Sequence, residues 1–351
     1  MNIPIIIPAY EPDERMLELL RNIRQDGVNN KIIVVNDGSG QEYDYLYDAA
    51  EEYDCIVLRN FVNMGKGRAL KYAFNYCLVN CDNLLGVVTA DSDGQHSVAD
   101  IKKCINALIE SPNSLVLGCR NFDGDDVPAK SKFGNKLTQK ICKLLCGINI
   151  SDTQTGLRGI PKSFMAELLN VEGERFEFET RMLIESKTKY VIKEIGIQTI
   201  YDSKENHKTH FDPIRDSIRI YKIFGSMLIK FIFSSLSSCV VDLLLFHVFS
   251  NILRGKISTY IIMATVGARI ISATYNFLLN HRFVFKSEEN YQKSAYKYAL
   301  LACVQMICSA GFVTIGCQMF SFIPEILVKV IVDTILFMIS YVVQREIVFK
   351  K

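Results

Sequence analysis

The sequence predicts an α/β domain with a Rossmann-like, mostly parallel sheet, followed by an all-α transmembrane domain of four helices. Strand-like and helix-like segments alternate up to about residue 215, as they do in chains that form parallel sheets. Four long apolar stretches follow, and Asp and Glu are concentrated before residue 220. A chain of 351 residues has room for two domains, and we expect them at residues 1–222 and 223–351.

The apolar runs of the first domain are short, and each ends in a polar turn. We expect strands at Ile3–Pro8, Lys31–Val35, Cys55–Leu58, Leu84–Thr89 and Leu115–Gly118. Helical spacing of apolar residues between them predicts helices at Glu14–Gln25, Tyr43–Tyr53, Arg68–Cys81 and Asp100–Glu110. In an open α/β sheet, ligands bind outside the carboxyl ends of the strands, so the loops that follow these strands are the candidate site.

The most informative loop reads Asp91-Ser92-Asp93-Gly94-Gln95 and follows the strand Leu84–Thr89. Oxygen ligands at alternate positions are those that Mg²⁺ or Mn²⁺ prefers beside a bound diphosphate. A lone Asp-x-Asp is more often a polar turn. The other loops at the same edge of the sheet favour a metal-assisted nucleotide site.

Two further loops meet this edge, Pro8-Ala9-Tyr10-Glu11 and Asn36-Asp37-Gly38-Ser39. The Asp37 carboxylate is suited to accept hydrogen bonds from a base N–H or a ribose hydroxyl, and Gly38 allows close approach of the backbone. Lys66 or Arg68, at the start of a helix, is placed to meet a phosphate. The sequence has neither a P-loop nor a G-x-G-x-x-G after its first strand.

Composition narrows the class of protein. The net charge of +2 argues against nucleic-acid binding, and a mean hydropathy of +0.14 fits a chain that is half soluble and half membrane-embedded. The 11 cysteines show no Cys-x-x-Cys or Cys/His metal spacing, so we expect scattered thiols in a reducing compartment or in lipid.

The ordered series IPAYEPDE, VVNDGSG, NMGKGRAL, ADSDGQH, LGCRNF and SDTQTGLRG resembles family 2 glycosyltransferases of GT-A fold, in particular the polyprenyl-phosphate (dolichol-phosphate mannose synthase-like) branch. The resemblance runs to about residue 220. It implies that Asp91, Asp93 and Gln95 hold the metal and that Asp91 and Asp93 are catalytic. The implied donor-binding residues are Pro8, Tyr10, Glu11, Asp37, Lys66, Asp91, Ser92, Asp93, Gln95, Arg120 and His210.

The sequence departs from this family at a few positions. Asn36 stands where many relatives carry Asp, and Lys130 and Lys132 stand where relatives often carry Arg, which removes bidentate phosphate recognition. The chain has no Trp. The Gln-x-x-Arg-Trp motif of related processive polysaccharide synthases is therefore absent, which favours transfer of a single sugar.

The acceptor is expected on the side of residues 130–158. The basic stretch KSKFGNKLTQKICK fits a solvated helix face or a cradle for a lipid phosphate, in which Lys130, Ser131, Lys132 and Asn135 would be the ligands. By resemblance, Ser151–Arg158 lines the acceptor side. Asp152 and Arg158 are further candidate catalytic residues, and Asp152 is a candidate general base. A phosphate monoester is already largely ionised near neutral pH, so a base is optional, and we expect Asp152 to position groups and Arg158 to support acceptor or diphosphate charge.

Two later segments have open assignments. Glu177 and Glu179 fit either helix N-terminal charges or site residues. Tyr201–Asp216 contains Lys208, His210 and Arg215, and these cations are suited to a lid over the donor diphosphate.

Four apolar stretches in the second domain are long enough to cross a bilayer: Leu228–Leu253, Ile257–Leu279, Tyr298–Phe320 and Ile326–Val343. They contain Asp242, Arg269, Lys329 and Asp333. Because charges are costly inside a membrane, we expect Asp242 to pair with Arg269 and Lys329 with Asp333, although Lys329 alone could reach an interface.

Basic residues predict the orientation. They concentrate between the second and third spans, at the C-terminus and before the first span, so we expect the catalytic domain and both termini in the cytoplasm. The second and fourth spans end in related segments, NHRFVFK and QREIVFK, which suggests a duplicated two-span unit. This region resembles the GtrA-like four-helix membrane family. Its apolar faces are compatible with a homo-oligomer.

The leading hypothesis is a membrane-bound hexosyltransferase that moves one sugar from a UDP- or GDP-linked donor to undecaprenyl or dolichyl phosphate, with Mg²⁺ or Mn²⁺ and with inversion at the anomeric carbon. One alternative is a transporter or flippase of a lipid-linked sugar, regulated by the first domain. The other is a membrane-anchored transferase that acts on a cell-envelope polysaccharide.

Overall fold

In a computed structural model, the chain forms two compact units, residues 1–223 and residues 224–351. The structure describes residues 2–122, 129–187, 189–198, 215–255, 258–320 and 322–350. Of residues 129–131 and 216 it describes the backbone only.

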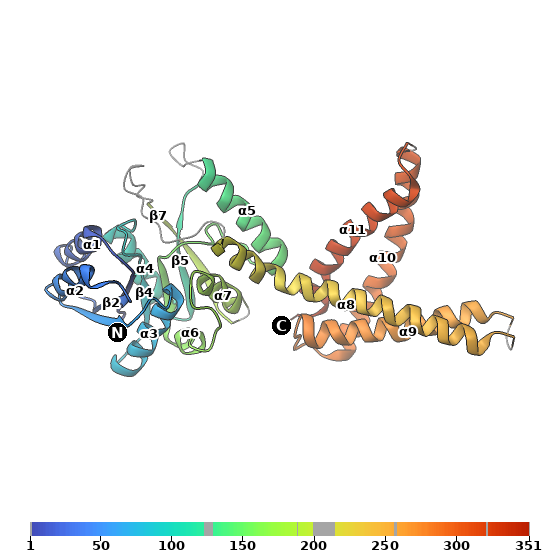
Figure 1. Cartoon of the computed structure of the whole chain (residues 1–351), viewed down its shortest axis with the longest axis horizontal. Coiled ribbons are helices and arrows are strands. Elements are labelled where there is room, and N and C mark those ends of the chain that lie inside the picture. The colour runs from blue at the N-terminus through green and yellow to red at the C-terminus, as the bar shows by residue number, and fades with distance from the viewer. Residues whose placement is uncertain are drawn as a thin grey trace. The chain divides into compact units, whose positions relative to one another are not determined.

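The first unit is built on a seven-stranded sheet of order β3-β2-β1-β4-β6-β5-β7 (Figure 1). Its strands are β1 (Ile5–Ala9), β2 (Ile32–Asp37), β3 (Cys55–Asn60), β4 (Gly86–Thr89), β5 (Ser114–Arg120), β6 (Arg158–Pro161) and β7 (Val191–Ile197). All neighbouring strands are parallel except β6, which is antiparallel to β4 and β5. The sheet confirms the predicted α/β class.

Helices cover both faces of this sheet (Figure 1). They are α1 (Glu14–Gln25), α2 (Asp44–Glu51), α3 (Lys66–Asn80), α4 (Val98–Glu110), α5 (Ala129–Cys146), α6 (Lys162–Leu168) and α7 (Glu177–Ser186). One hydrophobic core joins α1, α2 and α4 to alternate residues of the strands. Because strand side chains alternate between the two faces, the remaining strand residues face α3, which also contacts α6 and α7.

Local sequence explains why these helices form where they do. In α1, Met16, Leu19, Leu20 and Ile23 form one buried face, and the Asp13 carboxylate accepts a hydrogen bond from the Arg15 N–H as the N-cap. Burying such a stripe removes apolar area from water at roughly 25 cal/mol per Å². Both ends of α1 agree with the sequence-based prediction.

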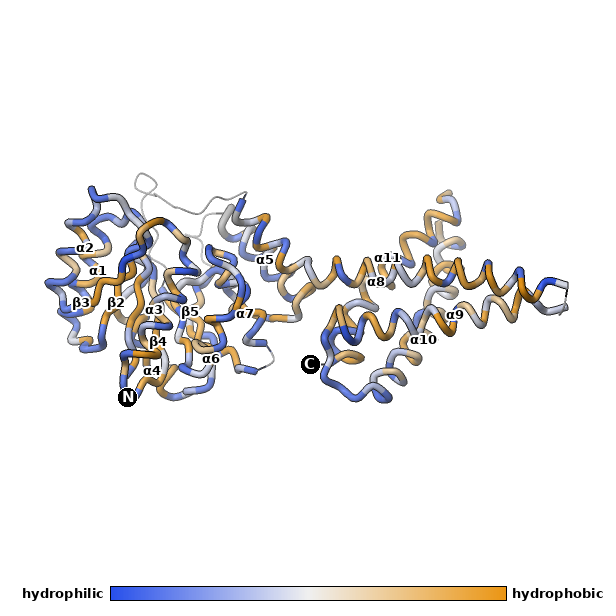
Figure 2. The backbone as a smooth tube through the Cα atoms, turned by 60° about the horizontal axis from the view of Figure 1, so that its bottom comes forward, coloured by the Kyte–Doolittle hydropathy of each residue, from blue (hydrophilic) through white to orange (hydrophobic). Residues whose placement is uncertain are grey.

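The sequence pattern does not predict β6 and β7. β6 has only four residues and contains a buried arginine, Arg158, while most side chains of the edge strand β7 are not buried. Neither has the continuous apolar character that marks the central strands in Figure 2. Pairing with neighbours, rather than local pattern, specifies these two strands.

The second unit is helical, which confirms the predicted all-α class. It contains most of α8 (Arg215–Leu253), with α9 (Tyr260–Leu279), α10 (Tyr291–Met319) and α11 (Glu325–Val343). Two π-helices, η2 (Asn280–Val284) and η3 (Gln344–Val348), continue α9 and α11. In the described part of the chain, four segments are long and apolar enough to cross a membrane: Ser217–Leu253, Tyr260–Val284, Tyr291–Met319 and Glu325–Val348 (Figure 2).

Both charge pairs that we expected within the spans are present. Arg269 Nη2 lies 3.4 Å from Asp242 Oδ2, which joins α9 to α8. Lys329 Nζ lies 2.8 Å from Asp333 Oδ2, one turn along α11. Each pair brings together charges that would be costly singly in a membrane.

Candidate active site

A cleft of about 830 Å³ lies in the first unit, at the carboxyl ends of β1, β2 and β4. This is the edge at which open α/β sheets bind ligands. The cleft is lined by loop residues from the first half of the unit and by later segments up to the start of α8. They are Pro8, Ala9, Tyr10, Arg15, Asp37, Asn63, Gly65, Lys66, Ala69, Asp91, Ser92, Asp93, Gln95, Arg120, Thr153, Gln154, Arg175, Phe176, Glu179, Thr180 and Ile220.

Asp37, at the end of β2, shapes one wall by holding the loop before α3. Its carboxylate accepts hydrogen bonds from Asn60 Nδ2 at 2.8 Å, Met64 N at 3.1 Å and Gly65 N at 2.7 Å. A carboxylate offers about four acceptor positions. These bonds leave about one acceptor position on Asp37 for a ligand in the cleft.

The turn after Asp37 needs glycine. Gly38 has φ +76°, and a Cβ there would lie 2.1 Å from the carbonyl carbon of Val62. Asn36 Oδ1 accepts a hydrogen bond from Ser39 N at 2.8 Å and so closes the turn. Ser39 Oγ in turn accepts one from Glu11 N at 2.8 Å. The structure does not place Glu11 in the lining of the cleft.

The Asp91 carboxylate is the centre of a charge network. Lys66 Nζ donates to Asp91 Oδ1 at 2.7 Å, and His96 Nε2 lies 3.4 Å from Oδ2. Burial opposes the negative charge, but Lys66 and His96 outweigh it and hold the pKa of Asp91 well below its usual range. Burial and the nearby Asp91 charge raise the pKa of Asp93. A bound cation would weaken the electrostatic repulsion between the Asp91 and Asp93 carboxylates.

Gly156 makes room for Asp91. A Cβ at position 156 would lie 2.1 Å from Asp91 Oδ2 and 2.5 Å from its Cγ. Thr89 Oγ1 donates to the Gly156 carbonyl at 2.7 Å, which ties the segment before β6 to the end of β4. A side chain at position 156 would therefore have to displace the Asp91 carboxylate.

Glu179 and Lys66 connect α7 to this network. Lys66 Nζ lies 3.1 Å from Glu179 Oε2. Burial disfavours the Lys66 charge, but Asp91 and Glu179 outweigh it and raise the pKa of Lys66, so its ammonium stays protonated. Glu177 has a different role, because its Oε1 accepts from Glu174 N and Arg175 N at 3.2 and 3.4 Å at the start of α7. Of the two glutamates, only Glu179 lines the cleft.

Arg158 lies beneath the cleft and does not line it. Its side chain is 1% exposed, Nε donates to Thr155 O at 2.9 Å, and Nη1 donates to Glu179 O at 2.8 Å. Arg158 thus braces the α7 segment that carries Glu179. This placement puts its guanidinium on backbone carbonyls rather than on the surface that a phosphate would meet.

Asp152 is fully buried and binds Arg120. Its carboxylate accepts from Arg120 Nε at 2.7 Å and Nη2 at 3.1 Å. Arg120 lines the cleft whereas Asp152 does not. This two-pronged contact fixes the plane of the guanidinium at the end of β5.

The predicted acceptor residues are less closely gathered. Asn135, on α5, donates to Ser151 O at 3.0 Å, and neither Asn135 nor Lys132 lines the cleft. The side chains of Lys130 and Ser131 lie outside the described residues. The same holds for His210 and the rest of the predicted lid up to residue 214.

The donor set fits a divalent cation that shares its ligands with a substrate. Asp91, Asp93 and Gln95 line the cleft together. Among the described residues, no three His, Cys, Asp or Glu side chains gather to hold an ion by themselves. Mg²⁺ is commonly bound through one or two carboxylates together with substrate phosphates, which this arrangement provides for.

Several cleft residues were not singled out from the sequence. They are Arg15, Asn63, Thr153, Gln154, Arg175 and Phe176. Thr153 is 4% exposed, and its hydroxyl has no hydrogen-bond partner among the residues that the structure describes. Leaving a buried polar group unpaired is costly, so Thr153 Oγ1 is a candidate contact for a ligand hydroxyl. Its position within the SDTQTGLRG motif was the only available signal.

Comparison with known families gives two matches. The model for glycosyl transferase family 2 matches residues 5–169. The model for the GtrA/DPMS transmembrane domain matches residues 230–349. The two matches fall in the two separate units of the structure.

Individual proteins are also similar. The chain is 31% identical over 226 residues to a UDP-N-acetylglucosamine–dolichyl-phosphate N-acetylglucosaminyltransferase of Methanococcus voltae, covering 56% of this chain and 85% of the relative. It is 28% identical over 202 residues to an uncharacterized protein of Methanocaldococcus jannaschii, covering 56% and 81%. Among solved structures, glucosyl-3-phosphoglycerate synthase from Mycobacterium tuberculosis aligns with a TM-score of 0.47 and 15% identity, over 63% of this chain and 76% of that one.

Proposed function

Because the chain belongs to glycosyl transferase family 2 and carries a GtrA/DPMS transmembrane domain, we propose that it moves one sugar from a nucleotide donor to a polyprenyl phosphate. The observation that carries this proposal is the meeting of Asp37, Asp91 and Asp93 in one cleft. The name of the Methanococcus voltae relative, which specifies a dolichyl-phosphate acceptor, supports the choice of lipid.

The donor occupies the cleft from Asp37 to Asp93. Asp37 accepts a hydrogen bond from the nucleoside through its remaining acceptor position, and Thr153 bonds a sugar hydroxyl. Asp91, Asp93 and Gln95 hold a divalent cation, Mg²⁺ or Mn²⁺. When bound, this cation supplies positive charge against the departing diphosphate.

The acceptor needs little help from a base. A phosphate monoester carries about −1.5 to −2 charge near neutral pH, so its oxygen attacks the anomeric carbon directly, with inversion. Arg120, oriented by Asp152, binds phosphate charge and aligns the two reactants. Asp152 acts as a positioning residue in this scheme, since its carboxylate is already bound by a guanidinium.

The membrane domain keeps this chemistry next to the lipid. Lys and Arg are concentrated in the segment between the second and third spans, after the fourth span and before the first. The positive-inside rule then places both termini and the catalytic domain in the cytoplasm, where nucleotide sugars are made.

The test is transfer by the purified full-length chain. It is incubated with undecaprenyl or dolichyl phosphate and a panel of UDP- and GDP-linked sugars, and lipid products are separated by thin-layer chromatography. We expect one donor to give a product, excess EDTA to abolish it, and Asp91→Asn to remove it while the protein stays folded. Hydrolysis without a lipid product, or transfer only to a polysaccharide, would contradict the proposed acceptor. Undiminished transfer in excess EDTA would contradict the proposed role of a divalent cation.

A further inference from the structure

The second unit is a duplicated pair of helices. The hairpin α8–α9 ends in η2 and the hairpin α10–α11 ends in η3. At the junction, Asn280 Nδ2 donates to Gln344 Oε1 at 3.1 Å. Phe285 stacks on Phe349 with ring centroids 5.3 Å apart. Each contact joins corresponding positions of the segments NHRFVFK and QREIVFK, as a two-fold axis between the hairpins requires.

Contacts from the first helix of each hairpin obey the same symmetry. Phe231 of α8 packs against Tyr341 of the other hairpin, with centroids 5.4 Å apart. Tyr298 of α10 packs against Phe277 of the other hairpin, at 5.6 Å. Because Phe277 and Tyr341 are corresponding residues, the two contacts are reciprocal. The predicted repeat is therefore present in the packing as well as in the sequence.

The repeat places a polar layer at one depth in both hairpins. Arg269 lies eleven residues before Asn280, and Asp333 lies eleven residues before Gln344. At the α-helical rise this is about 16 Å from the junction, near the middle of a hydrocarbon layer about 30 Å thick. In each hairpin the layer includes a contact between helices: Arg269 with Asp242, and Asp333 with Ser309 Oγ at 2.6 Å.

This layer is exposed in a single chain. The side chains of Arg269, Lys329 and Asp333 are 72%, 58% and 44% exposed. Charged side chains at this depth almost always face a protein interior or an aqueous cavity, because contact with lipid is costly. Something other than lipid is therefore expected to cover them.

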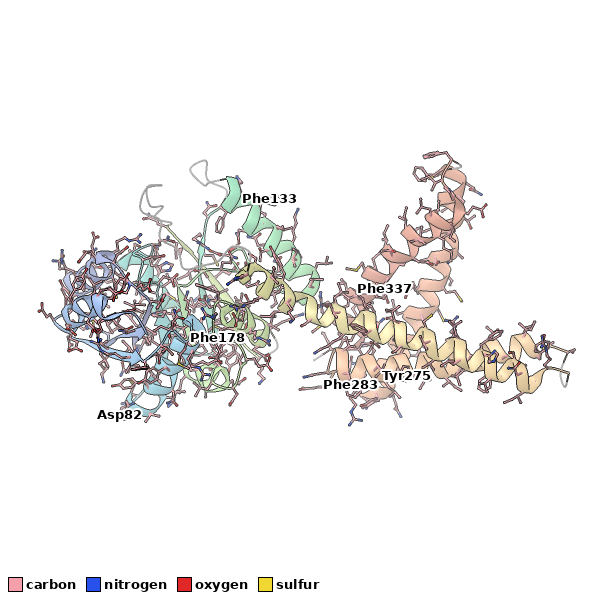
Figure 3. All side chains as sticks on the ribbon, in the orientation of Figure 1. Asp82, Phe133, Phe178, Tyr275, Phe283 and Phe337 are labelled. Carbon is pink, nitrogen blue, oxygen red and sulfur yellow. The ribbon has the colours of Figure 1, made fainter. Side chains whose placement is uncertain are left out.

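A groove of about 530 Å³ holds two of these charges. It is lined along one face of α11 by Ile326, Lys329, Val330, Asp333, Thr334 and Phe337. Phe337 lies 4.9 Å, centroid to centroid, from Phe231 of α8, beside that helix at the base of α11 (Figure 3). The lining face therefore points toward the first hairpin. Figure 1 shows the two hairpins diverging from their junction.

We propose that this groove receives the α8–α9 hairpin of a second copy of the chain, with the partner's Arg269 against Asp333. Charge complementarity selects this occupant, because the guanidinium and the carboxylate lie at equal distances from the same junction. A two-fold axis along the membrane normal makes the contact twice, since each copy offers both the hairpin and the groove. The membrane domain then forms a homodimer whose charged layer is enclosed.

The test uses the full-length chain in lipid nanodiscs and detergent, with its oligomeric state measured by mass photometry and by co-purification of two differently tagged copies. We expect the wild-type chain to be dimeric. Arg269→Glu or Asp333→Arg, each expressed alone, should weaken association about tenfold or more, because like charges then meet across the interface. Arg269→Lys should preserve the dimer. Arg254→Glu, the same charge change in an exposed position outside the layer, should also preserve it.

The decisive arm co-expresses Arg269→Glu with Asp333→Arg. One of the two interface contacts is then a reversed ion pair and the other is native, so the mixed dimer should recover near wild-type stability. Such recovery also shows that both variants fold. A monomeric wild-type chain, meaning that lipid covers the groove, would overturn the proposal. So would single variants that dimerise normally, or a mixed pair that does not recover.

Discussion

The substitution Gly156→Ala tests the position of Asp91 with a single added methyl group. The new Cβ would lie 2.1 Å from Asp91 Oδ2, whereas ordinary contact begins at 3.4 Å. The carboxylate must therefore move by more than 1 Å to reach ordinary contact with the new methyl group. The hydrogen bond from Lys66, 2.7 Å long, would also be lost or distorted.

A displacement of about 1 Å in a group that positions the reactants costs about 100-fold in rate, or about 2.7 kcal/mol of barrier. We therefore expect kcat for lipid-linked product to fall about 100-fold, while KM for the polyprenyl phosphate changes little. The assay is the initial rate of sugar transfer by the full-length chain at saturating donor and acceptor. Thermal unfolding of the same preparation measures whether the fold is intact.

Gly196→Ala is the matched control, because a Cβ at position 196 meets nothing within 4 Å. It should retain the wild-type rate. If Gly156→Ala also retained a rate within twofold of wild type while folded, the location of Asp91 would not matter to transfer. The assignment of Asp91 as a metal ligand and catalytic residue would then fail.

Two further predictions concern cleft residues that the sequence left open or missed. Thr153→Val should leave the melting temperature unchanged or raise it, since it removes a buried hydroxyl without a partner in the described chain. The same variant should bind the donor about tenfold more weakly in isothermal titration calorimetry. Unchanged affinity would exclude a contact between Thr153 and the donor. Glu179→Gln should lower kcat about tenfold by withdrawing one carboxylate from Lys66. Glu177→Gln should lower only the melting temperature, because the Glu177 carboxylate accepts hydrogen bonds from the backbone N–H groups of Glu174 and Arg175 in the turn before α7. Equal activities of the two variants would contradict this division.

The fold was predictable where one strand or helix carries its own pattern. The strand Ile5–Ala9 is wholly buried and apolar, and α1 has a single buried face between clear end signals. β6 carries no such pattern, because its buried Arg158 depends on the carbonyl of Glu179, 21 residues further along the chain. Its existence depends on the sheet around it, which a single-chain pattern does not reveal.

The candidate site, like the fold, was predictable only where a local sequence pattern marks its residues. Asp37 and Asp91 follow apolar strands, so the sequence alone was enough to bring them to one edge. Their partners come from β3, the loop before α3, the first residue of α3 and the loop before α4. Nothing local to Glu179 distinguishes it from Glu177. The choice between them depends on which side chain reaches Lys66 across more than one hundred residues of chain. The need for glycine at position 156 could not be predicted from the sequence either, because it is set by contact with Asp91 and not by the backbone angle of Gly156 itself.

Lys66 and a divalent cation would compete for the same carboxylate, that of Asp91. Lys66 Nζ occupies Asp91 Oδ1 at 2.7 Å, on the same carboxylate that a divalent cation would use. Because the pKa of Lys66 is raised, its side chain keeps its proton and its positive charge near neutral pH. A cation must therefore displace a like charge, which opposes its binding to the substrate-free protein. A nucleotide diphosphate removes this obstacle, because it offers Lys66 a new anionic partner.

Lys66→Met should consequently bind Mn²⁺ about tenfold more tightly than the wild-type chain in the absence of nucleotide, while transferring sugar more slowly. Electron paramagnetic resonance of free Mn²⁺ measures the first effect without depending on activity. Arg68→Met is the control, since Arg68 Nε binds Glu174 at 2.6 Å and lies outside the cleft lining. Equal Mn²⁺ affinity in Lys66→Met and wild type would mean that the ammonium and the cation do not share a carboxylate. Asp91 would then hold Lys66 as a structural partner, and the cation would have to be sought elsewhere in the cleft.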